Sequence, residues 1–243
     1  MPNWSRNYLT ISGTRNDMLD LYKHLLKTQN GDEVFKFSNV FPIPDKIKNT
    51  ISPSSSAIGR KFMDVGTNKA RSTKIDQILD GESKDDVKLI PVENNTPEKC
   101  VELKKEFGVD NWYDWNVSNY GTKWDIEVRS GEYTKSDTCF VCEFDTAWSP
   151  PFNFIDRLQI KFPKIDIDLI WDIEGYDDCG RLYTKRSEDG VTFHFEESKL
   201  VYRTSEGEEI KYTENGWVYV ETGNPCDDDV FDNSIAENPF HGN

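Results

Sequence analysis

The sequence is short of positive charge. It holds 29 Lys and Arg residues against 44 Asp and Glu residues, which gives a formal net charge of −15 at pH 7. A chain with this charge repels phosphate backbones and anionic membrane surfaces, so direct binding of nucleic acid or of a membrane is disfavoured. The same charge favours a partner protein with a basic surface.

Long apolar runs and a secretion signal are also missing. No apolar run approaches the roughly 18 residues that a membrane-spanning helix needs, and the segment Met1 to Tyr8 has no basic start followed by an apolar stretch. We therefore expect a soluble, cytoplasmic protein.

The cysteines are few and odd in number, at positions 100, 139, 142, 179 and 226. Without a secretion signal, this count favours reduced thiols over a disulfide framework. Cys139 and Cys142 spell C-x-x-C, but the segment around them alternates like a strand, which places the two sulfur atoms on opposite faces. A zinc or redox pair needs both sulfur atoms at one centre, so buried structural thiols are the favoured interpretation.

Catalytic motifs are scarce as well. There are three histidines, His24, His194 and His241, and none stands beside a cysteine or serine in a recognisable motif. The chain has no G-x-S-x-G, H-E-x-x-H, Walker A or G-x-G-x-x-G pattern. We expect no catalytic residue, cofactor or metal, although a catalytic triad can be assembled from distant residues, so an enzyme stays open as a third hypothesis.

Hydrophobic periodicity predicts an α+β fold over residues 1–175. Alternation predicts strands at Asn7–Ser12, from Lys123 to Arg129, from Thr138 to Trp148 and at 166–174, with a further short strand at Val34–Val40. Helical spacing predicts one helix after Asn16 that stops at Asn30-Gly31, and another that Pro150-Pro151 opens and Pro163 ends. This is the β-α-β-β-α-β order of the split βαβ, or ferredoxin-like, fold, an antiparallel sheet with helices on one face.

The remaining residues are predicted to form an insertion, an extension and a tail around this core. Residues 45–110 behave as a long insertion, with a short helix at Thr73–Leu79 and a second helix that Thr96-Pro97 opens and Gly108 ends. Residues 176–225 predict a C-terminal extension of two β-hairpins, which turn at Asp189-Gly190 and Asn215-Gly216. Residues 226–243 are acidic and are expected to form a flexible tail.

Four separated motifs carry a family resemblance. They are M-P-N-W at Met1–Trp4, N-V-F-P-I-P at Asn39–Pro44, W-Y-D-W-N-V-S-N-Y-G-T-K-W-D at Trp112–Asp125, and F-D-T-A-W-S-P-P at Phe144–Pro151. In this order they resemble the YubB ferredoxin-like domain family of bacteriophage and plasmid proteins, over roughly residues 1–175. The resemblance implies a ferredoxin-like sheet and an origin in a mobile element, hence a place in the cytosol of a bacterial host. It supplies no catalytic residues.

Two sets of residues are candidates for binding. The first is acidic: alternation puts Asp166, Asp168, Asp172 and Glu174 on one face of a strand, and Asp227, Asp228 and Asp229 lie in the tail. Such a row can imitate the phosphates of DNA and engage a basic groove, can hold a metal ion through oxygen ligands, or can be a solvated edge that charge protects from strand pairing.

The second set is aromatic. Its members could line a ligand pocket or could simply form the core, and Trp115 and Trp124 in particular are expected to be largely buried. The candidates are Trp112, Trp115, Tyr120, Lys123, Trp124, Asp125, Asp145 and Trp148.

The resemblance and the charge together suggest a function. We expect a non-enzymatic phage or plasmid protein that binds and inhibits a host protein through its acidic surface, with a nucleic-acid-handling or defence factor as its target. The alternative is a module that holds a small, nucleotide-like ligand in an aromatic pocket.

Overall fold

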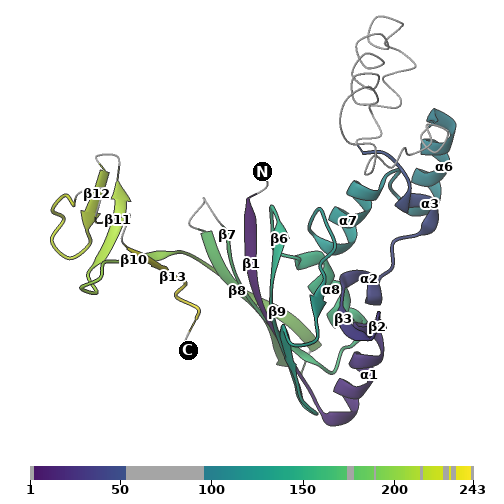
Figure 1. The fold of residues 1–243 in the computed structure, drawn as a ribbon, viewed down its shortest axis with the longest axis horizontal. Helices are drawn as coiled ribbons and strands as arrows, with labels where there is room; N and C mark the ends of the chain where they lie inside the picture. The colour runs from purple at the N-terminus through teal and green to yellow at the C-terminus, as the bar shows by residue number, and fades with distance from the viewer. Residues whose placement is uncertain are drawn as a thin grey trace, which may run out of the picture.

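The protein is an α+β chain built on antiparallel sheets (Figure 1). A computed structural model describes residues 3–52, 96–173, 178–188, 190–213, 216–226, 230 and 234–241. The elements are β1 (Trp4–Ser12), α1 (Arg15–Leu25), β2 (Leu26–Gln29), β3 (Asp32–Phe35), α2 (Phe37–Val40), α3 (Asp45–Lys48), α6 (Pro97–Phe107), α7 (Trp112–Tyr120), β4 (Val128–Arg129), β5 (Tyr133–Lys135), β6 (Cys139–Ala147), α8 (Phe152–Lys161), β7 (Asp166–Ile173), β8 (Asp178–Ser187), β9 (Gly190–Lys199), β10 (Val201–Arg203), β11 (Glu209–Thr213), β12 (Gly216–Tyr219) and β13 (Ile235–Glu237).

The main sheet has six strands in the order β5-β6-β1-β7-β8-β9, and each neighbouring pair is antiparallel. The N-terminal strand β1 lies inside this sheet. Its residue Leu9 faces Cys142 on one side and Leu169 on the other. The predicted strands around Asn7–Ser12, Thr138 and Asp166 are therefore confirmed, and all three meet in the middle of the sheet.

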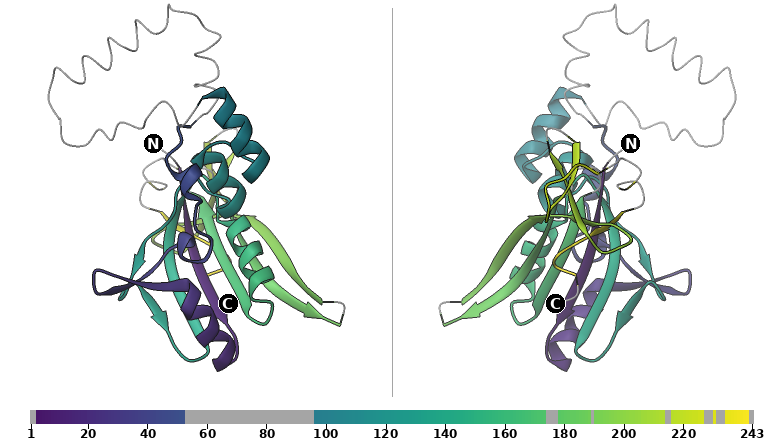
Figure 2. Two further views of the ribbon diagram at one scale, coloured as in Figure 1. Left: turned by 90° about the vertical axis from the view of Figure 1, so that its right-hand side faces the viewer. Right: turned by 90° about the vertical axis from the view of Figure 1, so that its left-hand side faces the viewer.

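One face of the main sheet is covered by α1 and α8. The alternating residues of β1, β6 and β7 that point to this face are buried, and they share one core with Met18 and Leu21 of α1 and with Phe154 and Leu158 of α8. Figure 2 shows both helices in front of the sheet in its left view, while the C-terminal sheet is in front in its right view. The period-two pattern of the strands thus fixes which face carries the helices.

The first helix is shorter than its apolar pattern predicts. It begins after Thr14, whose hydroxyl accepts a hydrogen bond from the Asp17 N–H, and it ends at Leu25. The prediction that it continues to Asn30-Gly31 is wrong, because these two residues form the turn of the β2–β3 hairpin, with φ of 51° and 96°. Asn-Gly is the preferred pair for such a turn, and it acts here as a hairpin signal instead of a helix stop.

Two other strand predictions need correction. The predicted strand Val34–Val40 is β3 at its start and then the short helix α2. The predicted strand from Lys123 to Arg129 is a strand only at Val128–Arg129. The loop before it is held in place by Asp125. The carboxylate of this residue accepts hydrogen bonds from the backbone N–H groups of Phe37 at 2.8 Å and Ser38 at 3.4 Å. This long-range contact outweighs the local alternation.

Local capping residues define the two ends of α6. The Thr96 hydroxyl accepts from the Lys99 N–H at 3.2 Å at the start of α6, and Gly108 ends that helix with φ of 79°. This confirms the helix predicted between Thr96-Pro97 and Gly108. The helix predicted at Thr73–Leu79 lies outside the described residues.

The C-terminal hairpins form as predicted, but in two different sheets. β8 and β9 extend the main sheet, whereas β11 and β12 belong to a separate sheet with the order β12-β11-β10-β13. The prediction of a flexible tail is wrong for Ile235–Glu237, because this segment is β13 and pairs with β10. Within the described residues, no helix is both long and apolar enough to span a membrane.

Candidate functional site

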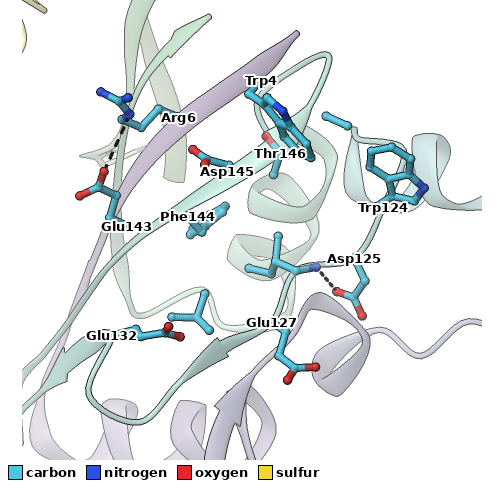
Figure 3. A pocket seen from close by; sticks show the side chains of 13 residues that line it. Trp4, Arg6, Trp124, Asp125, Glu127, Glu132, Glu143, Phe144, Asp145 and Thr146 are labelled. Carbon is cyan, nitrogen blue, oxygen red and sulfur yellow. Dashed lines mark hydrogen bonds and ion pairs between the residues drawn. The ribbon is translucent and has the colours of Figure 1, made fainter. Parts of the chain in front are cut away.

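A groove of about 750 Å³ lies along the outer edge of β6, at the start of β1 (Figure 3). One wall is β6 from Glu143 to Ala147, and the other is the loop that leads from Trp124 into β4. The lining residues of β6 alternate between the two faces of the sheet, since Glu143 and Asp145 are exposed while Phe144 and Thr146 are buried. Only a groove that follows the edge of a strand can be lined from both faces, so the edge of β6 is the floor of this site.

Tryptophan side chains form the rim of the groove. The ring centroids of Trp4 and Trp124 are 6.0 Å apart, and each residue is 39% exposed. The Lys123 ammonium lies over the Trp124 ring, 4.4 Å from its centroid. The prediction that Trp124 is largely buried is therefore wrong, and its indole face already binds a cation from within the chain.

Carboxylates dominate the lining. Asp125, Glu127, Glu132, Glu143 and Asp145 line the groove together with a single guanidinium, that of Arg6. The cavity therefore has an excess of negative charge.

These carboxylates differ in how well they are compensated. Lys36 hydrogen-bonds to Glu127 at 2.6 Å and lowers the pKa of that carboxyl. The Arg6 Nε lies 3.9 Å from a Glu143 oxygen, which is a loose contact between two exposed side chains. In the part of the chain that the structure describes, Asp145 has no ion-pair partner. On the β6 wall, Glu143 and Asp145 are thus available to an incoming cation.

The predicted acidic row of β7 is less available. Asp168 receives a two-pronged ion pair from Arg181, with nitrogen–oxygen distances of 3.0 and 2.6 Å, and Asp166 pairs with Arg186 at 2.6 Å. Asp172 lies under the C-terminal segment, and burial raises the pKa of its carboxyl. Glu174, Asp227, Asp228 and Asp229 lie outside the described residues. Two members of the row therefore already have cationic partners within the chain.

The same C-terminal segment covers part of the open face of the main sheet. The His241 ring packs edge-on against Tyr8 with centroids 3.8 Å apart, and the Asn238 side-chain amide donates to the Trp171 carbonyl at 3.1 Å. No group of three or more histidine, cysteine or carboxylate side chains suited to a metal ion occurs among the described residues.

The predicted aromatic set divides into core and groove. Trp115 and Tyr120 are 7% and 1% exposed, and the Tyr120 hydroxyl donates to the Phe41 carbonyl at 2.6 Å. Trp112 packs against the same core, and Trp148 is 49% exposed without lining the groove. The members that line the groove are Trp124, Asp125 and Asp145.

Sequence reasoning missed the other half of the site. Trp4, Arg6 and Glu143 join the groove through the β1–β6 pairing, in which Arg6 faces Asp145 across the ladder. A signal for them was present, since Trp4 and Arg6 alternate with the inward Ser5 and Asn7 and so had to point away from the core. An outward tryptophan at the start of a strand is a better marker of a binding surface than an inward one.

Thiol reactivity should follow burial. Cys142 and Cys179 are buried, and burial raises the pKa of both thiols, that of Cys179 to about 11. Because the thiolate is the reactive form, we expect native protein to be alkylated first at the half-buried Cys139 and Cys226, and the buried thiols to react only after unfolding. Peptide mapping after timed iodoacetamide treatment measures this order, and elemental analysis of the same sample tests the expected absence of bound metal. Early labelling of Cys142 would contradict the strand assignment.

A comparison with protein families finds similarity to a ferredoxin-like domain. The family model described as the ferredoxin-like domain in Api92-like protein matches residues 119–214, a range that contains the β6 wall of the groove and continues through β11. Comparisons with curated proteins and with solved structures give no match. Residues 119–214 are therefore similar to a ferredoxin-like domain family, in agreement with the antiparallel α+β architecture.

Proposed function

We propose that this chain is a non-enzymatic binding protein that holds a basic segment of a partner protein in the groove beside β6. The observation that carries the proposal is the composition of the groove, which combines five carboxylates, one guanidinium and two exposed indole rings in about 750 Å³. Carboxylates attract lysine and arginine side chains, and indole faces bind the same cations.

The charge of the whole chain supports the same partner. A net charge of −15 produces a long-range field that accelerates the approach of a basic protein and retards that of an acidic one. The field is screened beyond about 10 Å at 0.1 M salt, so the association rate should depend on ionic strength.

A nucleotide-like ligand fits the groove less well. Its phosphates would have to approach Glu143 and Asp145, and like charges placed together without a counter-ion are unfavourable. The tryptophan pair could stack on a base, but the lining supplies only the Arg6 guanidinium for a phosphate group.

The finer assignments belong to this proposal as well. The sequence of β1, α1, β5, β6, α8 and β7, with the sheet order β5-β6-β1-β7, supports a split βαβ core. The four sequence motifs support an origin in a phage or plasmid. A mobile element benefits from small inhibitors of host proteins, so we propose that occupation of a basic surface on a host nucleic-acid-handling or defence factor is the biological role.

A defined peptide tests the binding function. An eight-residue peptide of alternating lysine and valine, labelled with fluorescein, should bind the wild-type protein at low salt, and fluorescence anisotropy measures its Kd. The double variant Glu143→Gln, Asp145→Asn removes two negative charges from the groove and should weaken binding about tenfold. Exposed charges contribute little to folding, so the variant should keep its thermal midpoint.

A charge-matched control separates the groove from the general field of the protein. Glu206→Gln with Glu208→Gln removes the same charge from an exposed turn before β11, far along the chain from the groove. We expect this control to bind the peptide as the wild type does. Equal weakening by both double variants, or no binding by the wild type, would reject the groove as the binding site.

A further inference from the structure

The backbone of β6 has a defined inner and outer edge. The Trp148 N–H donates to the Asn3 carbonyl at 2.9 Å, and the Gly13 N–H donates to the Thr138 carbonyl at 3.1 Å, so both ends of the β1–β6 ladder are fixed. In an antiparallel ladder, directly hydrogen-bonded pairs alternate with pairs that are not hydrogen-bonded. The even-numbered residues of β6 therefore point their backbone groups toward β1, and the odd-numbered residues point theirs toward the outer edge.

Two further hydrogen bonds agree with this alternation. On the outer edge, the Cys139 carbonyl accepts from the Ser136 N–H at 2.8 Å, and the Ala147 carbonyl accepts from the Thr122 hydroxyl at 2.9 Å. Both acceptors are odd-numbered residues. The N–H and C=O groups of Asp145 consequently point outward, into the groove.

No strand covers this part of the edge within the described residues. β5 pairs with β6 only from Phe140 to Cys142, while β6 itself continues to Ala147. The Ala147 carbonyl is already taken by Thr122, so the uncovered stretch runs from Glu143 to Thr146. It spans about 10 Å at the usual strand rise, which is long enough for a short added strand. An uncovered edge of this kind is a template for pairing with another chain.

We propose that the basic partner segment binds as an additional β-strand along this edge of β6, an inference that rests on the proposed function. An extended peptide in this position forms backbone hydrogen bonds with Asp145 and sends alternate side chains to the two faces of the sheet. On the open face its side chains meet Glu143 and Asp145. On the other face they meet Phe144 and the apolar residues Ile126 and Val128.

The two faces specify the sequence class that the groove accepts. Cationic side chains suit the carboxylate face, and apolar or aromatic side chains suit the Phe144 face, so the recognised segment alternates basic and apolar residues. A peptide with the same composition in the order Lys-Lys-Val-Val cannot place all its lysines on one face of a strand. It should bind about tenfold more weakly than the alternating peptide, since pockets for alternate side chains determine specificity in strand addition.

Amide hydrogen exchange tests the backbone pairing directly. Residue-resolved NMR exchange should show that the Asp145 amide exchanges at least about tenfold more slowly when the alternating peptide is bound, because its N–H becomes part of a ladder. The Phe144 amide, which already faces β1, should be little changed. Binding without any slowing at Asp145 would overturn strand addition while leaving the proposed function intact, and absence of binding would reject both.

A pair of variants provides a second measurement. Asp145→Ala removes the carboxylate but keeps the outward N–H, whereas Asp145→Pro removes both and does not break a hydrogen bond to β1. We expect the proline variant to lose at least about tenfold more affinity than the alanine variant. Equal affinities for the two would contradict the proposal, and if the proline variant fails to fold, the exchange measurement on the wild type decides.

Discussion

Replacing Trp115 by alanine should lower the free energy of unfolding by about 3 to 5 kcal/mol, the usual cost of removing a large aromatic side chain from a packed core. Trp115 is 7% exposed, and its ring meets Tyr120 edge-on with centroids 5.3 Å apart. Tyr120 in turn packs edge-on against Phe154 of α8 with centroids 6.5 Å apart, so the cavity would open beside the contact between α7 and α8. Urea denaturation of the wild type and the variant, fitted with one shared m value, measures the change in the free energy of unfolding.

Trp124→Ala is the matched control. This residue is 39% exposed, and its ring contacts are those with Trp4 and Lys123 at the groove. Its loss should cost about 1 kcal/mol, the value of a partly exposed aromatic pair, but it should weaken peptide binding. If the two tryptophan variants were equally destabilised, the division of the aromatic residues into core and rim would be incorrect.

Gly180→Ala should destabilise the protein by about 1 to 3 kcal/mol through overpacking. A Cβ atom at this position would lie 2.5 Å from Cζ2 of Trp171 and 2.6 Å from the Glu196 carbonyl oxygen. Gly180 faces Trp171 across the β7–β8 ladder, and the indole covers the space that a side chain would occupy. Relief would require the Trp171 ring to move, and that ring also stacks on Phe195. The thermal midpoint in calorimetry should fall accordingly.

Gly13→Ala tests whether any added methyl group would have the same effect. At Gly13 the nearest atoms to an added Cβ are 3.5 Å away, which is an ordinary contact distance. Alanine there should be close to neutral, or slightly stabilising because it restricts the unfolded chain. A loss at Gly13 as large as that at Gly180 would show that the cost is not specific to the Trp171 contact.

Helices and strands whose ends or faces are set by neighbouring residues could be predicted from the sequence. Thr96, Pro97 and Gly108 each act within one turn of α6, and the alternation around Asp166 acts along a single strand, so both could be identified from sequence. The failures involve distant partners. Asp125 holds the loop before β4 through Phe37 and Ser38, which lie more than eighty residues earlier in the chain.

The candidate site was only half predictable for the same reason. Trp124, Asp125 and Asp145 could be predicted because they lie in dense aromatic motifs. The alternation of β1 shows that Trp4 and Arg6 point outward, but the pairing with β6 that brings them to the groove is not visible in the local sequence. The arginine partners of Asp166 and Asp168 come from β8. The sequence of β7 alone therefore could not reveal that these two carboxylates are paired with cations.

The central place of β1 has a consequence for how the chain is made. This strand is synthesised long before its two partners, which begin only at Cys139 and Asp166. At the usual rates of synthesis, β1 waits on the order of 10 s before β6 emerges. During that interval its alternating apolar residues have no sheet to join, and closing so long a loop is slow. Protection of the nascent β1 segment by chaperones is therefore more important for this chain than for one whose central strand pairs with the next strand in sequence.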